Sequence, residues 1–151
     1  MNFNAGETNS CELFHLRDKQ MEIQRTFSGT AWEAKAGYCR ALRVANHIYV
    51  SGTAPIAEDG SVYAPGDAYA QTKFCIARIQ KALQDLGADL PDVVRVRLFV
   101  TDISRTEEFI QAHQEYFGAH PPTNTLVAIS ALVDPEMLVE VEAEAFCTNP
   151  E

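Results

Sequence analysis

The sequence has few basic side chains, few cysteines and no long apolar run, and each shortage argues against a class of protein. Its 12 Lys and Arg residues stand against 21 Asp and Glu residues, which gives a formal net charge of −9. A protein that binds the phosphates of nucleic acid normally presents a basic surface, so this balance argues against a nucleic-acid partner. No apolar stretch approaches the ~20 residues that a membrane-spanning helix needs. We therefore expect neither a nucleic-acid nor a membrane partner.

The four cysteines also lack the spacing of a metal site or a disulfide framework. Cys11, Cys39, Cys75 and Cys147 lie far apart, with no C-x-x-C pair and no histidine at ligand spacing. In a chain of 151 residues this pattern is typical of reduced thiols. The first residues lack the basic and then apolar order of a secretory signal. We expect a cytoplasmic protein without a zinc site.

The length predicts one domain, and turn-forming residues divide it into strands and helices. A chain of 151 residues can bury roughly two-thirds of its surface on folding. We expect residues 1–28 to be a variable lead-in and residues 29–151 to form the domain. Runs of strand-forming residues predict an edge strand at 21–27 and further strands at 41–44, 48–50, 92–102, 125–130 and 138–146.

Two helices are predicted between these strands. Asp67 is placed to cap the first helix, and Gly87 stands where a left-handed residue would end it. Ser104 and Glu107 match a capping box at the start of the second helix, which we expect over residues 104–118. The order of elements predicts an α+β fold, a two-layer sandwich in which both helices pack on one face of a mixed sheet.

The face of the sheet that the helices leave uncovered is predicted to be charged. Alternation places Phe99 and Phe146 on this face among charged side chains. Because charged side chains are seldom fully buried, this face is not expected to form part of the hydrophobic core of a monomer. Either this face is wet or it meets another subunit through paired charges, and we favour another subunit. Its charged members are Arg95, Arg97, Glu140, Glu142 and Glu144, whereas Val94, Val96, Leu98, Val100, Val139, Val141, Ala143 and Ala145 are predicted to face the other way.

Several short motifs occur together in one order and spacing. They are GYCRA (37–41), IYVSGTAP (48–55), VVRVRLFVTD (93–102), PPTNTLV (121–127) and VEVEAEAF (139–146). Together they resemble the Rid family of reactive intermediate deaminases, also called YjgF-like proteins, over most of the chain. The resemblance implies a fold like that of trimeric chorismate mutase and a homotrimer with a ligand cleft between each pair of neighbouring subunits. It also implies hydrolysis of enamines or imines with neither a metal nor an organic cofactor.

The resemblance also assigns roles to particular residues. Tyr38 matches the tyrosine of the family's pocket, and Ser51 and Gly52 match a pair at which a backbone group can reach the ligand. Glu140 matches the acidic residue that orients the attacking water, with Glu142 as the alternative if the register slips by one pair. We therefore predict Glu140 as the catalytic residue and the other three as substrate contacts.

One position departs from the family pattern. The arginine that holds the substrate carboxylate is replaced by Asn124, and Ile110 stands where the family often has an asparagine. Loss of a charge-assisted pair in a dry site costs about 2–5 kcal/mol, and an asparagine carries no charge to replace it. Asn124 is therefore either a turn residue or a contact for a neutral ligand. Arg40 lies two residues after Tyr38, faces the same side of an extended segment and could supply the missing cation.

Two functions remain open at this point. The first is an enzyme that hydrolyses a small imine or enamine, with a water placed by Glu140 and a backbone donor near Gly52. The second is a non-catalytic binding or regulatory protein that kept the cleft and lost the chemistry. Ribonuclease activity, with which some members of the family have been credited, is disfavoured by the net charge of −9.

Overall fold

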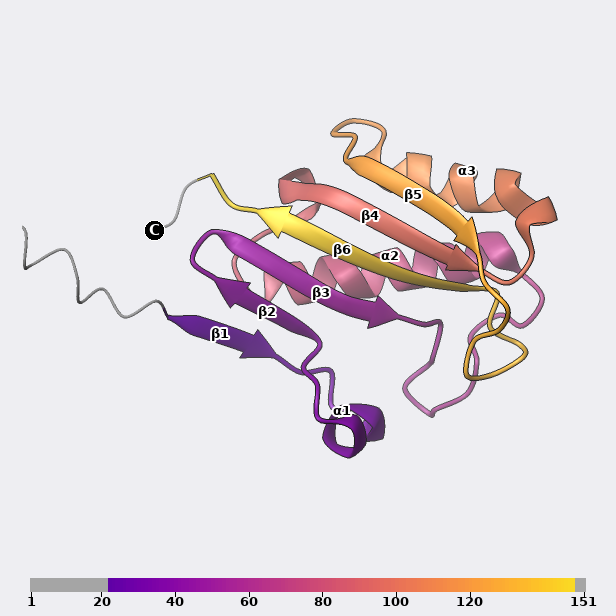
Figure 1. Ribbon diagram of the computed structural model, residues 1–151, viewed down its shortest axis with the longest axis horizontal. Coiled ribbons are helices and arrows are strands. Elements are labelled where there is room, and N and C mark those ends of the chain that lie inside the picture. Colours follow the sequence, from indigo (N-terminus) through magenta and orange to yellow (C-terminus); the bar gives the residue numbers. More distant parts are fainter. Residues whose placement is uncertain (1–21, 149–151) are drawn as a thin grey trace, which may run out of the picture.

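The computed structural model describes residues 22–148, which form one mixed sheet and its covering helices (Figure 1). The strands are β1 (Ile23–Thr26), β2 (Ala41–Val44), β3 (His47–Thr53), β4 (Val93–Val100), β5 (Thr123–Ala128) and β6 (Val139–Phe146). The α-helices are α1 (Ala31–Ala36), α2 (Ala68–Gln84) and α3 (Thr106–Phe117), with 3₁₀ turns at Leu90–Asp92 and Ile103–Arg105. None of these helices is both long and apolar enough to cross a membrane.

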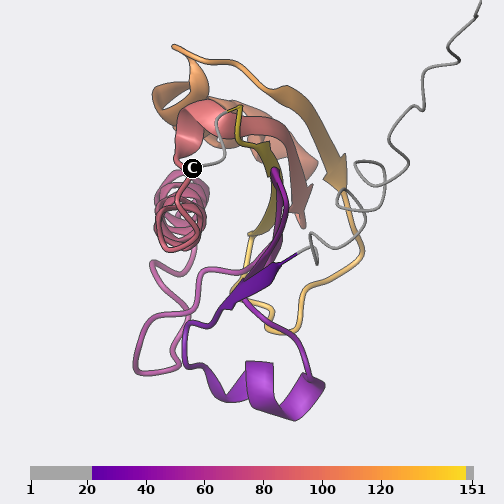
Figure 2. The same ribbon diagram turned by 90° about the vertical axis from the view of Figure 1, so that its left-hand side faces the viewer.

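The sheet has the strand order β1-β2-β3-β6-β4-β5, and all neighbours are antiparallel except β4 and β5. A parallel pair needs a crossover connection, which α3 supplies here. Helices α2 and α3 cover one face of the sheet, and within residues 22–148 the other face stays open (Figure 2). The two-layer α+β sandwich predicted from the sequence is therefore confirmed.

The predicted lead-in is described only in part. Strand β1 pairs with β2 at the edge of the sheet, as predicted for residues 21–27. Residues 1–21, which make up most of the expected lead-in, lie outside the described residues, as do residues 149–151. The domain boundary at residue 29 stays a prediction.

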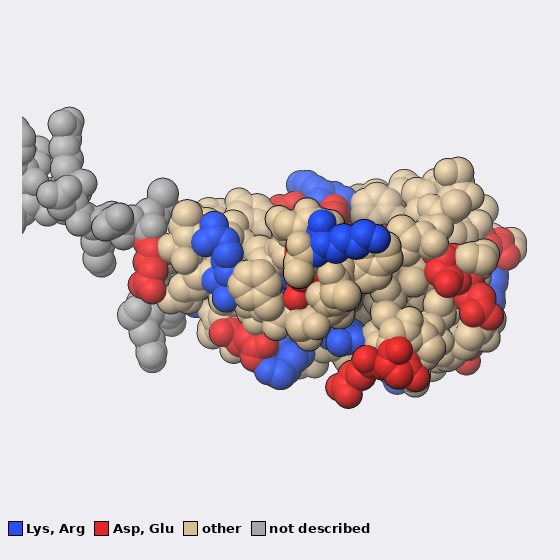
Figure 3. Space-filling model, turned by 90° about the horizontal axis from the view of Figure 1, so that it is seen from below, with Lys and Arg blue, Asp and Glu red and all other residues tan. Residues whose placement is uncertain are grey.

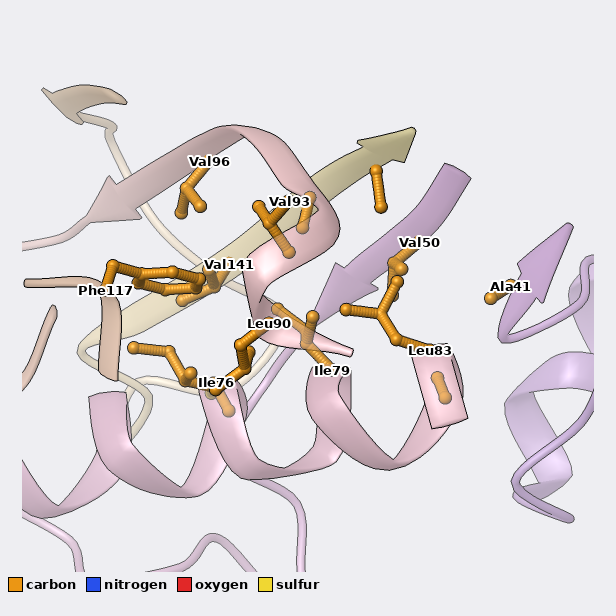
Figure 4. Packing of buried hydrophobic residues seen from close by; sticks show 14 of the residues in the cluster. Ala41, Val50, Ile76, Ile79, Leu83, Leu90, Val93, Val96, Phe117 and Val141 are labelled. Carbon is orange, nitrogen blue, oxygen red and sulfur yellow. The ribbon is translucent and has the colours of Figure 1, made fainter. Parts of the chain in front are cut away.

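Helix α2 supplies the centre of the core. Ile76, Ile79 and Leu83 point from this helix toward the sheet, where Val50 and Val141 lie opposite them (Figure 4). Complete burial of an aliphatic side chain of this size contributes roughly 1.5–3 kcal/mol before conformational entropy is subtracted. The apolar residues that recur at three- and four-residue spacing are thus what holds α2 on the sheet.

The ends of α2 are set by the two residues that the sequence indicated. The carboxylate of Asp67 accepts a hydrogen bond from the backbone N–H of Ala70 at 2.8 Å. Gly87 has φ +76°, and the following N–H, of Ala88, turns back to the carbonyl of Leu83 at 3.0 Å. Both the cap and the left-handed stop are confirmed.

One predicted side-chain orientation on β4 is wrong. The pairing of β4 with β6 is irregular between Val93 and Arg95, which breaks the simple alternation at the start of the strand. Val93 therefore takes the buried place with 4% exposure, and Val94 is 47% exposed. Alternation resumes at Val96, which is fully buried.

The predicted capping box of the second helix is also wrong. Asp102 accepts hydrogen bonds from both the N–H and the hydroxyl of Ser104, at 3.0 and 2.6 Å. This local turn uses the donors of Ser104 and starts a 3₁₀ segment, so α3 begins only at Thr106. A carboxylate two residues upstream competes for the donors that a capping box needs.

The open face of the sheet carries paired charges. Arg97 on β4 binds two carboxylates of β6, Glu142 at 2.5 Å and Glu144 at 3.2 Å. The three side chains are 30–34% exposed, so solvent screens these pairs and they contribute little to stability. On the side of the molecule shown in Figure 3, acidic and basic side chains also lie interspersed. That the open face meets another subunit stays a prediction.

Candidate functional site

A cleft of about 340 Å³ lies between α1, the β2–β3 end of the sheet, α2 and β6. Its volume is within the range of small-molecule pockets, which begins at roughly 300 Å³. Ile56 and Val133 give it apolar walls, and Trp32 stands at its rim. The structure brings five of the six predicted site residues to this cleft, namely Tyr38, Arg40, Ser51, Gly52 and Glu140.

Glu140 and Gly52 are in close contact within the cleft. A Cβ atom added at Gly52 would lie 2.0 Å from Oε1 of Glu140, far inside any van der Waals contact. The pairing of β3 with β6 is irregular here, between Val50 and Thr53. The absence of a side chain at Gly52 therefore makes room for the carboxyl group of its neighbour on β6.

The environment of Glu140 favours its neutral form. Burial raises the pKa of Glu140 above its ordinary value, the positive charge of Arg40 opposes this shift, and the nearby charge of Glu142 adds to it. A raised pKa makes a carboxylate a stronger base toward water and eases the return of the proton, as general acid–base work requires. The geometry is thus consistent with the predicted role of Glu140.

Arg40 is only partly satisfied by the protein around it. Its Nη2 donates to the carbonyl of Gly52 at 2.8 Å, and its guanidinium carbon lies 5.9 Å from the centroid of the Tyr38 ring. Its Nε is buried and has no hydrogen-bond partner within residues 22–148. A buried guanidinium donor without a partner is unusual, and a bound ligand is one way to satisfy it.

Ser51 supports the cleft wall instead of presenting a free nucleophile. Its hydroxyl donates to the carbonyl of Cys39 at 2.9 Å, and its N–H donates to the carbonyl of Arg40 at 3.0 Å. These two bonds tie the segment that carries Tyr38 and Arg40 to β3. The hydroxyl oxygen keeps its lone pairs and can still accept a hydrogen bond from a ligand.

Helix α1, which the sequence analysis missed, carries the rim of the cleft. Its Glu33 is only 5% exposed and accepts hydrogen bonds from the N–H and hydroxyl of Ser28 and the N–H of Gly29. Burial alone would raise the pKa of Glu33, but these hydrogen bonds hold it below its ordinary value. The anchored helix places Trp32, which is 47% exposed, at the cleft mouth. The left-handed Gly37 just after α1 was the signal available in the sequence.

Arg78 is the second missed residue of the cleft. It lies on α2 and reaches the cleft with a guanidinium group whose Nη1 donates to the carbonyl of Ile56 at 2.5 Å. Its guanidinium carbon lies 5.3 Å from the centroid of the Phe74 ring. In the sequence Arg78 sits next to the apolar stripe of α2, where an arginine is ordinarily read as a solvated surface residue.

Asn124, the sixth predicted site residue, lies elsewhere. In the register of β4 and β5 it pairs with the buried Val96, so it is on the face of the sheet that the helices cover. Glu140 pairs with Phe99 on the opposite face. Within one chain Asn124 and Glu140 therefore belong to different sites.

A second cavity of about 220 Å³, between α3 and β5, contains Asn124. Ile110 lines the same cavity, as does His113, whose Nε2 is buried without a hydrogen-bond partner in the described residues. Burial lowers the pKa of His113 and so favours the neutral form of its ring. The predicted residues thus divide into two sets, one in each cavity.

Within residues 22–148, no three His, Cys, Asp or Glu side chains are grouped so that they could hold a metal ion. The cleft offers one half-buried carboxyl group, two guanidinium groups and aromatic walls. This is the equipment for binding a small polar molecule and moving a proton. Of its hydroxyl groups, that of Ser51 donates to a backbone carbonyl and that of Ser28 donates to the Glu33 carboxylate that anchors α1.

The comparison with known proteins identifies the family. Residues 28–147 match the family model described as Endoribonuclease L-PSP. The chain therefore belongs to this family, the YjgF/RutC/Rid family, and has its chorismate-mutase-like fold. The resemblance stated from the sequence motifs is confirmed.

Individual relatives cover most of the chain. The Rv2704 protein of Mycobacterium tuberculosis, of the YjgF/YER057c/UK114 family, has a solved structure that is 38% identical with a TM-score of 0.76, covering 83% of this chain and 100% of that one. A RutC family protein of Pyrococcus abyssi is 35% identical over 72% of this chain and 85% of its own length. The 3-aminoacrylate deaminase RutC of Acinetobacter baylyi is 34% identical over 73% of this chain and 86% of its own.

Proposed function

We propose that this protein is a homotrimeric deaminase that hydrolyses a small imine or enamine. The observation that carries the proposal is the cleft in which a half-buried Glu140, with its raised pKa, lies beside Gly52 and near Arg40. Family membership supports it, as does the similarity to a 3-aminoacrylate deaminase, because 3-aminoacrylate is itself an enamine.

The division of the predicted residues between two cavities supports an active site shared by two subunits. In a ring of identical subunits each interface joins one patch of a chain to a different patch of its neighbour. One subunit would supply the cleft with Glu140, and its neighbour would supply the cavity with Asn124 and Ile110. A trimer of this kind has three equivalent composite sites.

The chemistry requires one water molecule and one proton relay. Glu140, as a carboxylate, accepts a proton from water while the water oxygen forms a bond to the C=N carbon. Glu140 returns this proton to the nitrogen, which gives a neutral carbinolamine. The hydroxyl proton of the carbinolamine then passes through Glu140 to the nitrogen as the C–N bond breaks and the C=O bond forms. The products are a carbonyl compound and ammonia, and Glu140 ends in its starting state.

A non-catalytic binding protein is the second candidate function. The observation that favours it is Asn124, because the second cavity presents an uncharged amide where the resemblance expects the arginine of the family. Such a protein would bind its ligand in the cleft without converting it.

Ammonia release from 2-aminoacrylate generated in situ, with and without the purified full-length chain, tests the proposal. We expect acceleration over the buffer rate, and we expect Glu140→Gln to abolish it while folding and assembly stay intact. Sedimentation equilibrium on the same samples measures the number of subunits. If a folded trimer accelerates the hydrolysis of neither 2-aminoacrylate nor an imine without a carboxylate, the deaminase function is excluded. The non-catalytic binding function then remains.

A further inference from the structure

The cleft contains a second cation that the family resemblance does not account for. Arg78 comes from α2, whereas Arg40 comes from the segment that leads into β2, so the two guanidinium groups enter the cleft from different layers of the fold. Both are half-buried. Both line the cleft together with one acidic side chain, Glu140.

Within the part of the chain that the structure describes, the two arginines of the cleft make no direct ion pair with a carboxylate. None of the ion pairs found within residues 22–148 includes Arg40, Arg78 or Glu140. Among the side chains that line the cleft, two arginines and one ionised glutamate leave a net charge of +1, and burial favours the neutral form of that glutamate. The Glu33 carboxylate lies outside the lining and also acts on Arg40, but its oxygens are bound to Ser28 and Gly29. This positive cleft lies in a protein whose formal net charge is −9. Such a local excess of positive charge attracts an anion.

The hydrogen bonds that the two arginines already make leave most of their donors available. Each guanidinium group carries five N–H donors, and each spends one on a backbone carbonyl, Arg40 on Gly52 and Arg78 on Ile56. These bonds fix the two groups in place instead of neutralising them. A carboxylate is the natural occupant, because a fixed guanidinium fork matches its two oxygens.

We propose that Arg78 and Arg40 form an anion-binding subsite within a single chain, and that the ligand of the cleft carries a carboxylate. The two arginines would bind the substrate carboxylate, which the uncharged Asn124 cannot pair with. This inference rests on the proposed function insofar as the ligand is the substrate, and it narrows the substrate class to imines and enamines of carboxylic acids. Arg78 is then a residue that determines specificity.

The test uses the binding of pyruvate, the product expected from 2-aminoacrylate, and of pyruvamide, which has the same shape without the charge. Trp32 reports occupancy through its fluorescence, because it lies at the rim of the cleft and is the single tryptophan of the chain. We expect the wild-type protein to bind pyruvate about tenfold or more tightly than pyruvamide. In Arg78→Gln this preference shrinks toward one, because pyruvate binding weakens and pyruvamide binding does not.

Matched variants separate the loss of a contact from a loss of structure. Arg95→Gln removes the same charge from an exposed residue of β4 outside the cleft, and we expect it to retain the full preference for pyruvate. Arg78→Lys keeps the charge without the fork, and we expect an intermediate preference. If Arg78→Gln fails to fold, the preference of the wild type and of Arg78→Lys decides the question.

The inference fails if the wild type binds pyruvamide as well as pyruvate, if it binds neither, or if Arg78→Gln keeps the wild-type preference. These outcomes are independent of turnover. Hydrolysis of 2-aminoacrylate without a preference for pyruvate would support the deaminase function and refute the anion-binding subsite. A preference for pyruvate without any hydrolysis would support the anion-binding subsite and refute the deaminase function.

Discussion

Replacing Gly52 by alanine tests whether the position of the Glu140 carboxyl group controls activity. The new Cβ would lie 2.0 Å from Oε1 of Glu140, whereas ordinary contacts begin at 3.4 Å. The carboxyl oxygen must therefore move by about 1.4 Å, the difference between these two distances. The atom that must move is the end of a flexible side chain, so the fold can absorb the change.

The expected effect on activity is large and the effect on stability is small. A misplacement of roughly 1 Å in a catalytic group costs about a hundredfold in rate, so we expect kcat/KM for 2-aminoacrylate to fall by about that factor. The melting temperature should shift by only a few degrees, since a change of ~1 kcal/mol moves Tm by roughly 2–8 °C in domains of this size range. Ammonia release and thermal unfolding measure the two quantities.

A double-mutant cycle shows whether the alanine acts through Glu140. If it does, Gly52→Ala combined with Glu140→Ala is no slower than Glu140→Ala alone, because the displaced group is already absent. Full activity in Gly52→Ala would refute the reasoning. So would an additive loss in the double variant, which would mean that Gly52 acts by another route.

Further predictions concern Glu33, Glu140 and the pair Val93 and Val94. Glu33→Gln weakens the charge-assisted hydrogen bonds that anchor α1, so the free energy of unfolding should fall by about 1–3 kcal/mol in chemical denaturation followed by Trp32 fluorescence. Because the folded-state pKa of Glu33 is depressed below 4.5, its contribution is present above that pH and lost as pH falls through the folded pKa; a denaturation series across acidic pH should show this loss in the wild type and not in Glu33→Gln. Because the pKa of Glu140 is raised above 4.5, kcat/KM should increase with pH, with the midpoint of the increase above pH 4.5. A pH profile with no such increase above pH 4.5 would contradict the role of the Glu140 carboxylate as base. Val93→Ala should cost about 1–3 kcal/mol and Val94→Ala less than about 0.5 kcal/mol in the same unfolding assay, and the reverse order would contradict the irregular register of β4.

The sequence predicted the fold wherever one local signal decided the structure. Asp67 and Gly87 mark the ends of α2 with their own backbone preferences, and the alternation of β6 is unbroken from Val139 to Ala145. Predictions failed where a second interaction competed. Val94 is turned outward because a register irregularity intervenes in the pairing with β6, which the sequence of one strand does not contain.

The candidate site was predictable to a different degree. The motifs identified Tyr38 and Glu140, because short segments of the family carry them in a fixed order. Arg78 was not identified, since its role depends on where α2 lies relative to the segment around Ile56. The sequence also did not predict that Asn124 and Glu140 lie on opposite faces of the sheet. The face that a strand residue occupies is known only once its partner strand is known.

The separation of the two cavities within one chain has a genetic consequence. If each active site is assembled from two chains as proposed, a chain damaged only in the Glu140 cleft still carries an intact second cavity, and the converse holds for a chain damaged near Asn124. Two separately inactive alleles would then restore some activity when expressed together, since mixed rings contain interfaces at which both halves are sound. For the same reason, either damaged chain would inactivate some of the sites in mixed trimers with wild-type subunits, which is a partial dominant-negative effect. The phenotype of a mutation would therefore depend on which other alleles the cell expresses.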